Sequence, residues 1–376
     1  MGGFMTFVLA FATAQLIWSF FAGRKVWRGW RLWLACLFFS VLDLGLVWLL
    51  MRHMPGLYGV NKVLLWGMVL CLVAQIIFNG LVTMAIFIRF ILRRVRRVPV
   101  DFKRRDMLKK SFLYPLVAAG LPAYGGFVES REQVLREVEI PVQGLTGPDG
   151  YRIVQLSDVH LGQFFSVEDL RRLLQQAAEQ GADVLAVTGD LFDDERMNEE
   201  AVQVLDSFVP SFPDGVYYVF GNHEHFRGVG QLKRYLAGTS INVLENEARQ
   251  VPGKELWFAG VDYPMRRDRF EADRQRMHRQ AMAEVPEGVT AVLLAHHPEC
   301  IDDGAESGVA LTLTGHTHGG QFGIFGFPIF PFFRYNRGLV KIGDSYGYVH
   351  SGNGSWFPCR IGCPPEIVTF TLVSRG

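Results

Sequence analysis

The sequence contains little cysteine, and none of it accompanies the histidine and aspartate motifs described below. There are five cysteines in 376 residues, so these motifs lack the thiolate ligands that a structural zinc site uses. Cys36 and Cys71 lie in apolar runs, where packing is the expected role, and Cys300 stands alone. Cys359 and Cys363 are close enough to pair in an oxidising compartment, and the alternative is two free thiols.

Net charge is also nearly absent, but the total conceals two halves of opposite sign. The chain carries 38 Lys or Arg and 37 Asp or Glu, a net charge of +1. Residues 1–130 hold 16 basic and four acidic side chains, whereas the remainder holds 22 basic and 33 acidic ones. An acidic second half disfavours nucleic acid as a partner, because phosphate contacts need Lys and Arg. A basic first half is typical of a membrane segment with charged cytoplasmic loops.

Charged residues are scarce in three long apolar runs, at residues 4–23, 32–51 and 63–88. Each run reaches the roughly 20 residues that a helix needs to cross a bilayer. A fourth run, 111–128, is shorter and contains two prolines, so it either crosses the membrane or lies at its surface. Residues 1–128 are therefore predicted to form an all-α transmembrane module of three to four helices. Asp43 is expected to face the helix bundle and to bond to Gln75 or Asn79.

Basic residues predict how this module is oriented in the cell membrane. Residues 24–31 and 89–110 are the basic loops, which places both in the cytoplasm and the N-terminus outside. Arg104-Arg105, followed by a modest apolar run, resembles a twin-arginine export signal. We therefore expect a multi-pass protein with its second half on the extracytoplasmic side. The alternative is that two arginines fall together in an already basic loop, which leaves the cytoplasmic side open.

The second half is predicted to be one layered α/β domain. Residues 129–150 are interpreted as a polar connector, and residues 151–376 as the domain. Strands are predicted at 152–156, 183–188, 216–220, 256–261, 290–295 and 309–314, with short paired strands between 338 and 372. Helices are predicted at 166–180, 199–208 and 267–284. Ser166 is expected to cap the first of these helices, with Asp169 at the capping-box position.

Polar motifs directly follow five of these strands. They are Asp158-Val159-His160, Gly189-Asp190 with Asp193, Gly221-Asn222-His223-Glu224, His296-His297 and Gly315-His316-Thr317-His318. In open α/β sheets the carboxyl ends of the strands converge on one crevice, so these side chains are expected to meet. Aspartate, asparagine and histidine together are typical ligands of Mn²⁺, Fe or Zn²⁺. One such motif means little, but five in order predict a metal centre.

This series of motifs resembles the calcineurin-like metallophosphoesterase family, closely over residues 150–320. The resemblance implies a β-sandwich flanked by helices in four layers, and two divalent metal ions, with manganese favoured. By motif, the ligands of the first ion would be Asp158, His160 and His318, those of the second Asn222, His296 and His316, with Asp190 bridging both. His223 would be the histidine that contacts the phosphate or protonates the leaving group, and Asp193 would orient it. His225, His297 and Glu224 are expected to support these loops rather than bind metal.

The residues agree with metal-dependent hydrolysis of a phosphoric ester. Two ions about 4 Å apart can stabilise both oxygens of an in-line displacement and activate a water near neutral pH. The anchored bacterial branches that the chain resembles include UDP-2,3-diacylglucosamine pyrophosphatases and phosphodiesterases. Alternatives are a non-enzymatic metal-binding scaffold, a nuclease, and a phosphatase acting on a soluble or protein phosphoester.

Phenylalanines after His318 bear on the substrate. Phe322, Phe325, Phe327, Phe330, Phe332 and Phe333 lie in a short span rich in glycine and proline. They form either an apolar lip that enters the membrane or holds an acyl chain, or part of the domain core. The first alternative favours a lipid-linked phosphodiester or pyrophosphate as substrate.

Overall fold

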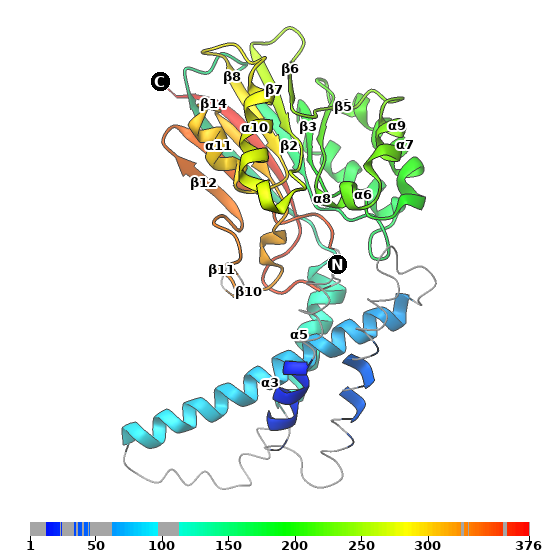
Figure 1. The fold of residues 1–376 in the computed structure, drawn as a ribbon, viewed down its shortest axis with the longest axis vertical. Coiled ribbons are helices and arrows are strands. Elements are labelled where there is room, and N and C mark those ends of the chain that lie inside the picture. Colours follow the sequence, from blue (N-terminus) through cyan, green and yellow to red (C-terminus); the bar gives the residue numbers. More distant parts are fainter. Residues whose placement is uncertain are drawn as a thin grey trace. The chain divides into compact units, whose positions relative to one another are not determined.

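The computed structural model describes residues 13–22, 24, 34, 37–39, 41–43, 45, 62–96, 113–324, 327–329, 331–355 and 359–375. The chain divides into two compact units, residues 1–128 and 129–376 (Figure 1). Each unit is described by itself below. Of the predicted basic loops, residues 25–31 and 97–110, including Arg104-Arg105, lie outside the described residues, whereas residues 89–96 belong to the helix Lys62–Arg96. Cys36, Phe325 and Phe330 also lie outside the described residues.

Among the described residues of the first unit, one helix is long and apolar enough to cross a membrane. Helix α3 (Lys62–Arg96) includes the 22-residue stretch Gly67–Ile88, whose mean hydropathy is 2.2. This agrees with the predicted run at 63–88. Helix α5 (Leu113–Tyr124) has 12 residues, contains Pro122 and continues into a π-helical turn, Gly125–Glu129. An α-helix of that length is shorter than a bilayer crossing requires. The runs at 4–23 and 32–51 are described only in part, so the multi-helix module stays a prediction.

Buried polar side chains connect the described helical segments of this unit. Gln75 Nε2 and Asn79 Nδ2 both donate to Ser19 Oγ, each over 2.7 Å. Asp43 is buried, as expected of a group that avoids lipid, and of its two expected partners Gln75 is the one whose side chain acts on its carboxylate.

The second unit is built on two six-stranded sheets (Figure 1). The first has the order β1-β14-β2-β3-β4-β5, with bounds Val134–Gln143, Glu366–Arg375, Tyr151–Leu156, Val184–Thr188, Val216–Val219 and Asn242–Val243. The second has the order β12-β13-β9-β8-β7-β6, with bounds Gly338–Ile342, Ser345–Val349, Leu311–Thr314, Thr290–Ala295, Leu256–Val261 and Glu247–Gln250. Strands β2, β3, β4 and β5 are parallel, and so are β13, β9, β8 and β7.

The two sheets pack face to face, with helices outside each. One hydrophobic core joins Ile153 and Val368 of the first sheet to Phe258, Val292 and Leu313 of the second. The first sheet is covered by α6 (Val167–Ala178), α7 (Asn198–Ser207) and α9 (Val229–Leu236), and the second by α10 (Phe270–Met282) and α11 (Cys300–Glu306). The predicted β-sandwich flanked by helices is therefore confirmed for this unit.

Local signals in the sequence account for most of these elements. Each of the six predicted strands from 152 to 314 is present, with ends shifted by no more than two residues. Ser166 caps α6 as predicted, because Asp169 N donates to Ser166 Oγ and Ser166 N donates to Asp169 Oδ2. The predicted helix 267–284 is a 3₁₀ turn, Arg267–Arg269, followed by α10.

The segment interpreted as a polar connector differs most from expectation. Within residues 129–150, β1 runs for 10 residues and pairs in parallel with β14. Val138, Ile140 and Val142 alternate with more exposed residues, which is the period of a half-buried strand. Pro141 is tolerated because β1 is an edge strand.

This pairing makes β1 part of the core, and a substitution tests it. Ile140 is fully buried between the sheets. We expect Ile140→Ala to lower the free energy of unfolding by about 2–5 kcal/mol through the cavity it leaves. Leu135→Ala, on the same strand but 57% exposed, should change it by no more than about 0.5 kcal/mol. Denaturant unfolding of the detergent-solubilised chain measures both, and equal effects would contradict the placement of β1.

Candidate active site

The predicted ligands all lie where strands end. Asp158 and His160 follow β2, Asp190 follows β3, and Asn222 begins the short helix α8 (Asn222–Phe226) after β4. His296 follows β8, and His316 and His318 follow β9. Strands β2, β3 and β4 are parallel to one another, and so are β8 and β9. Their carboxyl ends therefore share one edge of the sandwich.

Histidine and carboxylate atoms from these loops form compact groups. Asp158, His160 and His318 offer ligand atoms that all lie within 4.8 Å of one another. The same limit holds for Asp190 with His296 and His316. The first group is the set predicted for the first ion, and the second joins the predicted bridging residue Asp190 to two of the three residues predicted for the second ion. A third group of the same size joins His160 to Asp193 and His223, so the two sets and the predicted catalytic pair are contiguous.

Asp190 lies between the two sets of ligands. Its Oδ2 atom is 3.0 Å from His296 Nε2 and 3.9 Å from His160 Nε2. His296 Nε2 is in turn 3.2 Å from His316 Nδ1, and His160 Nε2 is 3.0 Å from His318 Nε2. A single carboxylate is therefore within reach of a cation in either set, as the bridging role requires.

The donor atoms fit divalent metal ions. Imidazole nitrogens facing each other at 3.0 Å need a cation or proton between them, since both otherwise present lone pairs. Asn222 Oδ1 is buried and lacks a hydrogen-bond partner among the described residues. His296 Nδ1 lies 2.8 Å from Thr188 O, which leaves Nε2 as the atom that can bind metal. Oxygen and imidazole ligands without thiolate suit Mn²⁺, Fe or Zn²⁺.

Electrostatics at the site calls for positive charge. Burial lowers the pKa of His316 and His318, which keeps these imidazoles neutral with lone pairs available. Burial also opposes charge on His296, but Asp190 and Asp158 outweigh it and raise the pKa of His296 to about 10. These carboxylates thus retain a proton on a buried imidazole. A divalent ion meets the same demand for positive charge.

Backbone strain is concentrated on the same residues. Seven non-glycine residues in the described part of the chain have positive φ, and five are predicted ligands: Asp158, His160, Asp190, His316 and His318, with φ between 51° and 72°. Each such residue costs of order 1–3 kcal/mol and persists only where surrounding contacts enforce it. Strain that falls selectively on predicted ligands marks a functional site rather than a turn.

Two motif glycines are required because ligand carboxylates approach them. A Cβ atom on Gly221 would collide with Asp190 Oδ1, and one on Gly315 would collide with Asp158 Oδ2. Only glycine leaves space for these carboxylates at the positions before Asn222 and His316, whatever the backbone conformation there.

Glu224 supports the Asp190 loop, as expected. The side chain is 1% exposed. Its carboxylate accepts hydrogen bonds from the backbone N–H of Asp190, Leu191, Phe192 and Gly221 and from Tyr218 Oη, over 2.7–3.1 Å. A carboxylate engaged in this way is a support for the loop and is turned away from a ligand role.

His223 and Asp193 form the expected pair beside the ligand groups. His223 Nδ1 is 2.9 Å from Asp193 Oδ1, and His223 Nε2 is 4.0 Å from Asp190 Oδ2. Its side chain is 22% exposed, whereas that of His296 is 0%. Burial opposes its charge, but Asp190 and Asp193 raise the pKa of His223 to about 9, so it holds a proton at neutral pH. This is the state that a general acid needs.

Several neighbouring residues were not singled out from the sequence. Arg227 Nε donates to Asp193 Oδ1 over 3.0 Å, which adds a cation beside the pair. Asp262, at the end of β7, lies 2.7 Å from His225 Nε2, so His225 supports this wall as expected. Tyr263 follows it, with its ring 5.6 Å from that of His316. In the sequence, the position of Asp262-Tyr263 at the end of a predicted strand could have indicated that these residues lie near the site. The pair does not resemble the metal motifs, however.

Cys359 and Cys363 are buried, and no disulfide joins them. Of the two alternatives for these cysteines, the structure therefore shows the thiol form.

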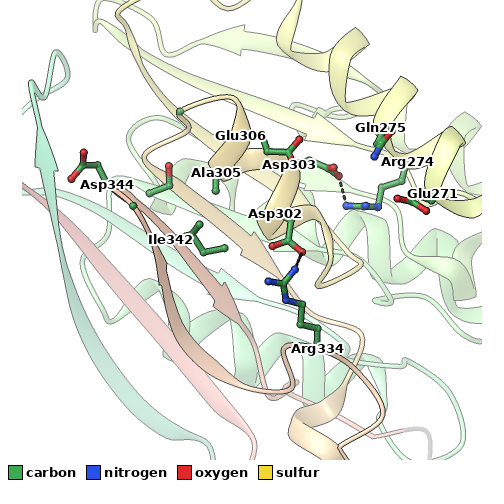
Figure 2. Close-up of a pocket in the computed structure, with 13 residues that line it drawn as sticks. Glu271, Arg274, Gln275, Asp302, Asp303, Ala305, Glu306, Arg334, Ile342 and Asp344 are labelled. Carbon is green, nitrogen blue, oxygen red and sulfur yellow. Dashed lines mark hydrogen bonds and ion pairs between the residues drawn. The ribbon is translucent and has the colours of Figure 1, made fainter.

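A cavity elsewhere in the second unit contains none of the predicted ligands. It has a volume of about 730 Å³ and lies among α10, α11 and the β12–β13 turn (Figure 2). Arg274 pairs with Asp303 and Arg334 with Asp302 in its wall. Its acidic side chains are thus partly neutralised, and the chemistry belongs to the strand-end site.

Comparison with known proteins agrees with this geometry. The family model for calcineurin-like phosphoesterases matches residues 151–320, the range that supplies every predicted ligand. The chain contains a calcineurin-like metallophosphoesterase domain. This metallophosphoesterase domain belongs to the metal-dependent phosphoester hydrolases, as predicted.

Relatives of the metallophosphoesterase chain come from bacteria and animals. An uncharacterized metallophosphoesterase of Bacillus subtilis, YkuE, is 29% identical over 73% of this chain and 98% of its own length. A Danio rerio protein described as a transmembrane protein with metallophosphoesterase domain is 29% identical over 70% of this chain and 63% of its own. The phosphodiesterase YaeI of Escherichia coli is 28% identical over 59% of this chain and 82% of its own.

Substitutions separate the acid from the bridging carboxylate. His223→Asn should retain both metal ions and lose about 10²–10⁴-fold in kcat, because only proton transfer to the leaving group is removed. Asp190→Asn should lose metal and activity together. Metal analysis of the purified variants alongside kcat measures this. Full activity in His223→Asn would contradict its role as acid.

Proposed function

We propose that the chain is a membrane-anchored, binuclear metal-dependent phosphoesterase that hydrolyses a phosphodiester or pyrophosphate, with a lipid-linked substrate. The observation that carries the proposal is the position of Asp190 between two histidine groups, with the proton-bearing His223 alongside. A scaffold that only binds metal has no need of a positioned acid.

The proposed ligands divide between two ions. Asp158, His160 and His318 hold the first, Asn222, His296 and His316 hold the second, and Asp190 serves both. When bound, the two ions supply positive charge that stabilises the phosphoryl oxygens and lowers the pKa of a water, which becomes the nucleophile. Manganese is the favoured metal, with iron and zinc as alternatives.

The chain's own residues then handle the proton. His223 is positively charged at neutral pH and reaches the site from its more exposed side. It donates its proton to the oxygen that leaves phosphorus, and Asp193 holds the ring in orientation through Nδ1. The name of the Escherichia coli relative, a phosphodiesterase, supports a diester as one substrate.

Exposed aromatic side chains near the site support a lipid-linked substrate. Phe327 is 76% exposed and Phe332 82% exposed, on and just after the hairpin of β10 (Gly323–Ile324) and β11 (Phe327–Pro328). Phe333 joins this hairpin region to the site, with its ring 5.2 Å from that of His316. On the other flank Phe226 is 62% exposed, and its ring lies 5.8 Å from that of His223. Apolar rings left in solvent beside a site that handles phosphate suit a substrate with an acyl chain.

The helix at Gly67–Ile88 and the transmembrane relative from Danio rerio support a membrane location. We propose a multi-pass anchor with the catalytic unit on the extracytoplasmic side, on the basis of the basic loops and Arg104-Arg105. The acidic composition of the catalytic half disfavours nucleic acid as a substrate.

Removal of metal tests the reaction class. The detergent-solubilised chain should hydrolyse a chromogenic phosphodiester, lose that activity after chelation, and regain it with Mn²⁺. A panel of monoester, diester and pyrophosphate substrates completes the test. No metal-dependent hydrolysis of any of them would defeat the enzyme proposal.

Substitutions in the exposed hairpin region test the lipid link. Phe327→Ser combined with Phe332→Ser should lower kcat/KM for a lipid-linked diester about tenfold or more, because each buried phenyl ring contributes about 1.5–3 kcal/mol. Activity on a small soluble diester should stay within about twofold. Leu135→Ser, also exposed but on β1, is the matched control. Equal losses on both substrates would argue against an acyl-chain contact.

A further inference from the structure

Arg360 is a buried arginine whose hydrogen-bond acceptors are all neutral among the described residues. Its side chain is 0% exposed. Nε donates to Ser355 Oγ over 3.0 Å, Nη1 to Ser351 O over 2.7 Å and to Cys363 O over 3.2 Å, and Nη2 to Gly354 O over 2.5 Å, while Nη2 also lies 3.3 Å from His318 Nδ1. The guanidinium thus spans two segments of chain without an ion pair.

Burying the Arg360 guanidinium without an ion pair costs free energy, so we looked for a contribution of Arg360 to the site. Burial lowers the pKa of the Arg360 guanidinium, as expected for a cation removed from water. A buried charge without a close counter-ion adds little to stability compared with an apolar side chain of the same size. Asp158 is among the negative groups that act on it from a greater distance. The gain must therefore be sought in what Arg360 holds in place.

On one side, Arg360 holds a loop that supports Asp158. Asn353 N donates to Ser157 O over 2.9 Å, Ser157 N donates to Asn353 Oδ1 over 2.9 Å, and Gly354 N donates to Asp158 O over 3.0 Å. A Cβ atom on Gly354 would collide with Val159 O, so this loop presses directly on the backbone that carries the ligand. Arg360 binds this same loop through Ser351 O, Gly354 O and Ser355 Oγ.

On the other side, Arg360 reaches the backbone of His318. Besides its contact with the His318 ring, it donates to Cys363 O, and Cys363 Sγ lies 3.2 Å from His318 O. His318 follows β9 of the second sheet, whereas Asp158 follows β2 of the first. Hydrogen bonding within either sheet therefore leaves the spacing of these two ligands undetermined. Arg360 contacts supports of both.

We infer that Arg360 is a positioning residue that sets the spacing of Asp158 and His318 and so the affinity of one of the two metal ions. The inference rests on the proposed binuclear site. None of its hydrogen bonds reaches Asp190, His296 or His316. Substitution of Arg360 should therefore lower the affinity for the ion held with Asp158 and leave the affinity for the other ion nearly unchanged.

The test measures Mn²⁺ binding to the detergent-solubilised full chain by equilibrium dialysis and by electron paramagnetic resonance. Arg360→Met should weaken one of two ions about 10–100-fold, the range typical for groups that orient metal ligands. Arg360→Lys keeps the charge but lacks the planar fork that spans several acceptors, so it should weaken the same ion about tenfold or more. As the Mn²⁺ concentration is lowered, the exchange-coupled signal of the ion pair should disappear at a higher concentration in both variants than in the wild-type chain.

A second buried arginine provides the structural control. Arg274 is 6% exposed and pairs with Asp303 near the cavity of Figure 2, where it contacts none of the proposed ligands. Arg274→Met should lower the melting temperature while both ions keep their wild-type affinities. This separates loss of stability from loss of ligand spacing.

Two background variants identify which ion is affected. In His316→Asn, the remaining tight ion is the one held with Asp158, and adding Arg360→Lys should weaken it. In His160→Asn, the remaining ion is the other, and the same addition should change its affinity by no more than about threefold. Wild-type affinity for both ions in Arg360→Met and Arg360→Lys, or equal weakening of both, would overturn the inference. A wild-type chain that binds fewer than two ions would instead overturn the binuclear site itself.

Discussion

Asp190 Oδ2 lies 3.0 Å from His296 Nε2, which follows β8 of the second sheet, and 3.9 Å from His160 Nε2, which follows β2 of the first. One carboxylate oxygen can serve both groups only if the two sheets pack with their carboxyl ends at the same edge. The core between the sheets provides this, and Glu224 holds the loop of Asp190 with its carboxylate. The rest of the site is arranged around that shared atom.

The site is held in a conformation that the local chain disfavours. Left-handed backbone at five predicted ligands and a buried guanidinium without an ion pair among the described residues both cost free energy. These costs are tolerable because the ligands extend from strands that are buried on both faces, so the loops have rigid ends. Precise ligand spacing is thus maintained by packing at a distance from the ligands as much as by contacts beside them.

The two units contribute separately to the proposed function. The metallophosphoesterase domain supplies the reaction, and the helix at Gly67–Ile88 supplies a candidate membrane anchor. In the proposed function, exposed Phe327 and Phe332 suit a substrate with an acyl chain, which an enzyme anchored at a bilayer would meet.

Local patterns in the sequence were sufficient for the six strands between residues 152 and 314, the α6 cap, the apolar helix and the metal motifs, because strand period, capping chemistry and ligand type are carried by neighbouring residues. Tertiary structure decided the rest. Only the pairing with β14 turns residues 134–143 into a strand of the domain, and only packing brings Arg360 to His318, 42 positions earlier. The absence of a disulfide between Cys359 and Cys363 likewise depends on side-chain placement. Contacts between distant segments follow from how two sheets pack, which no local period encodes.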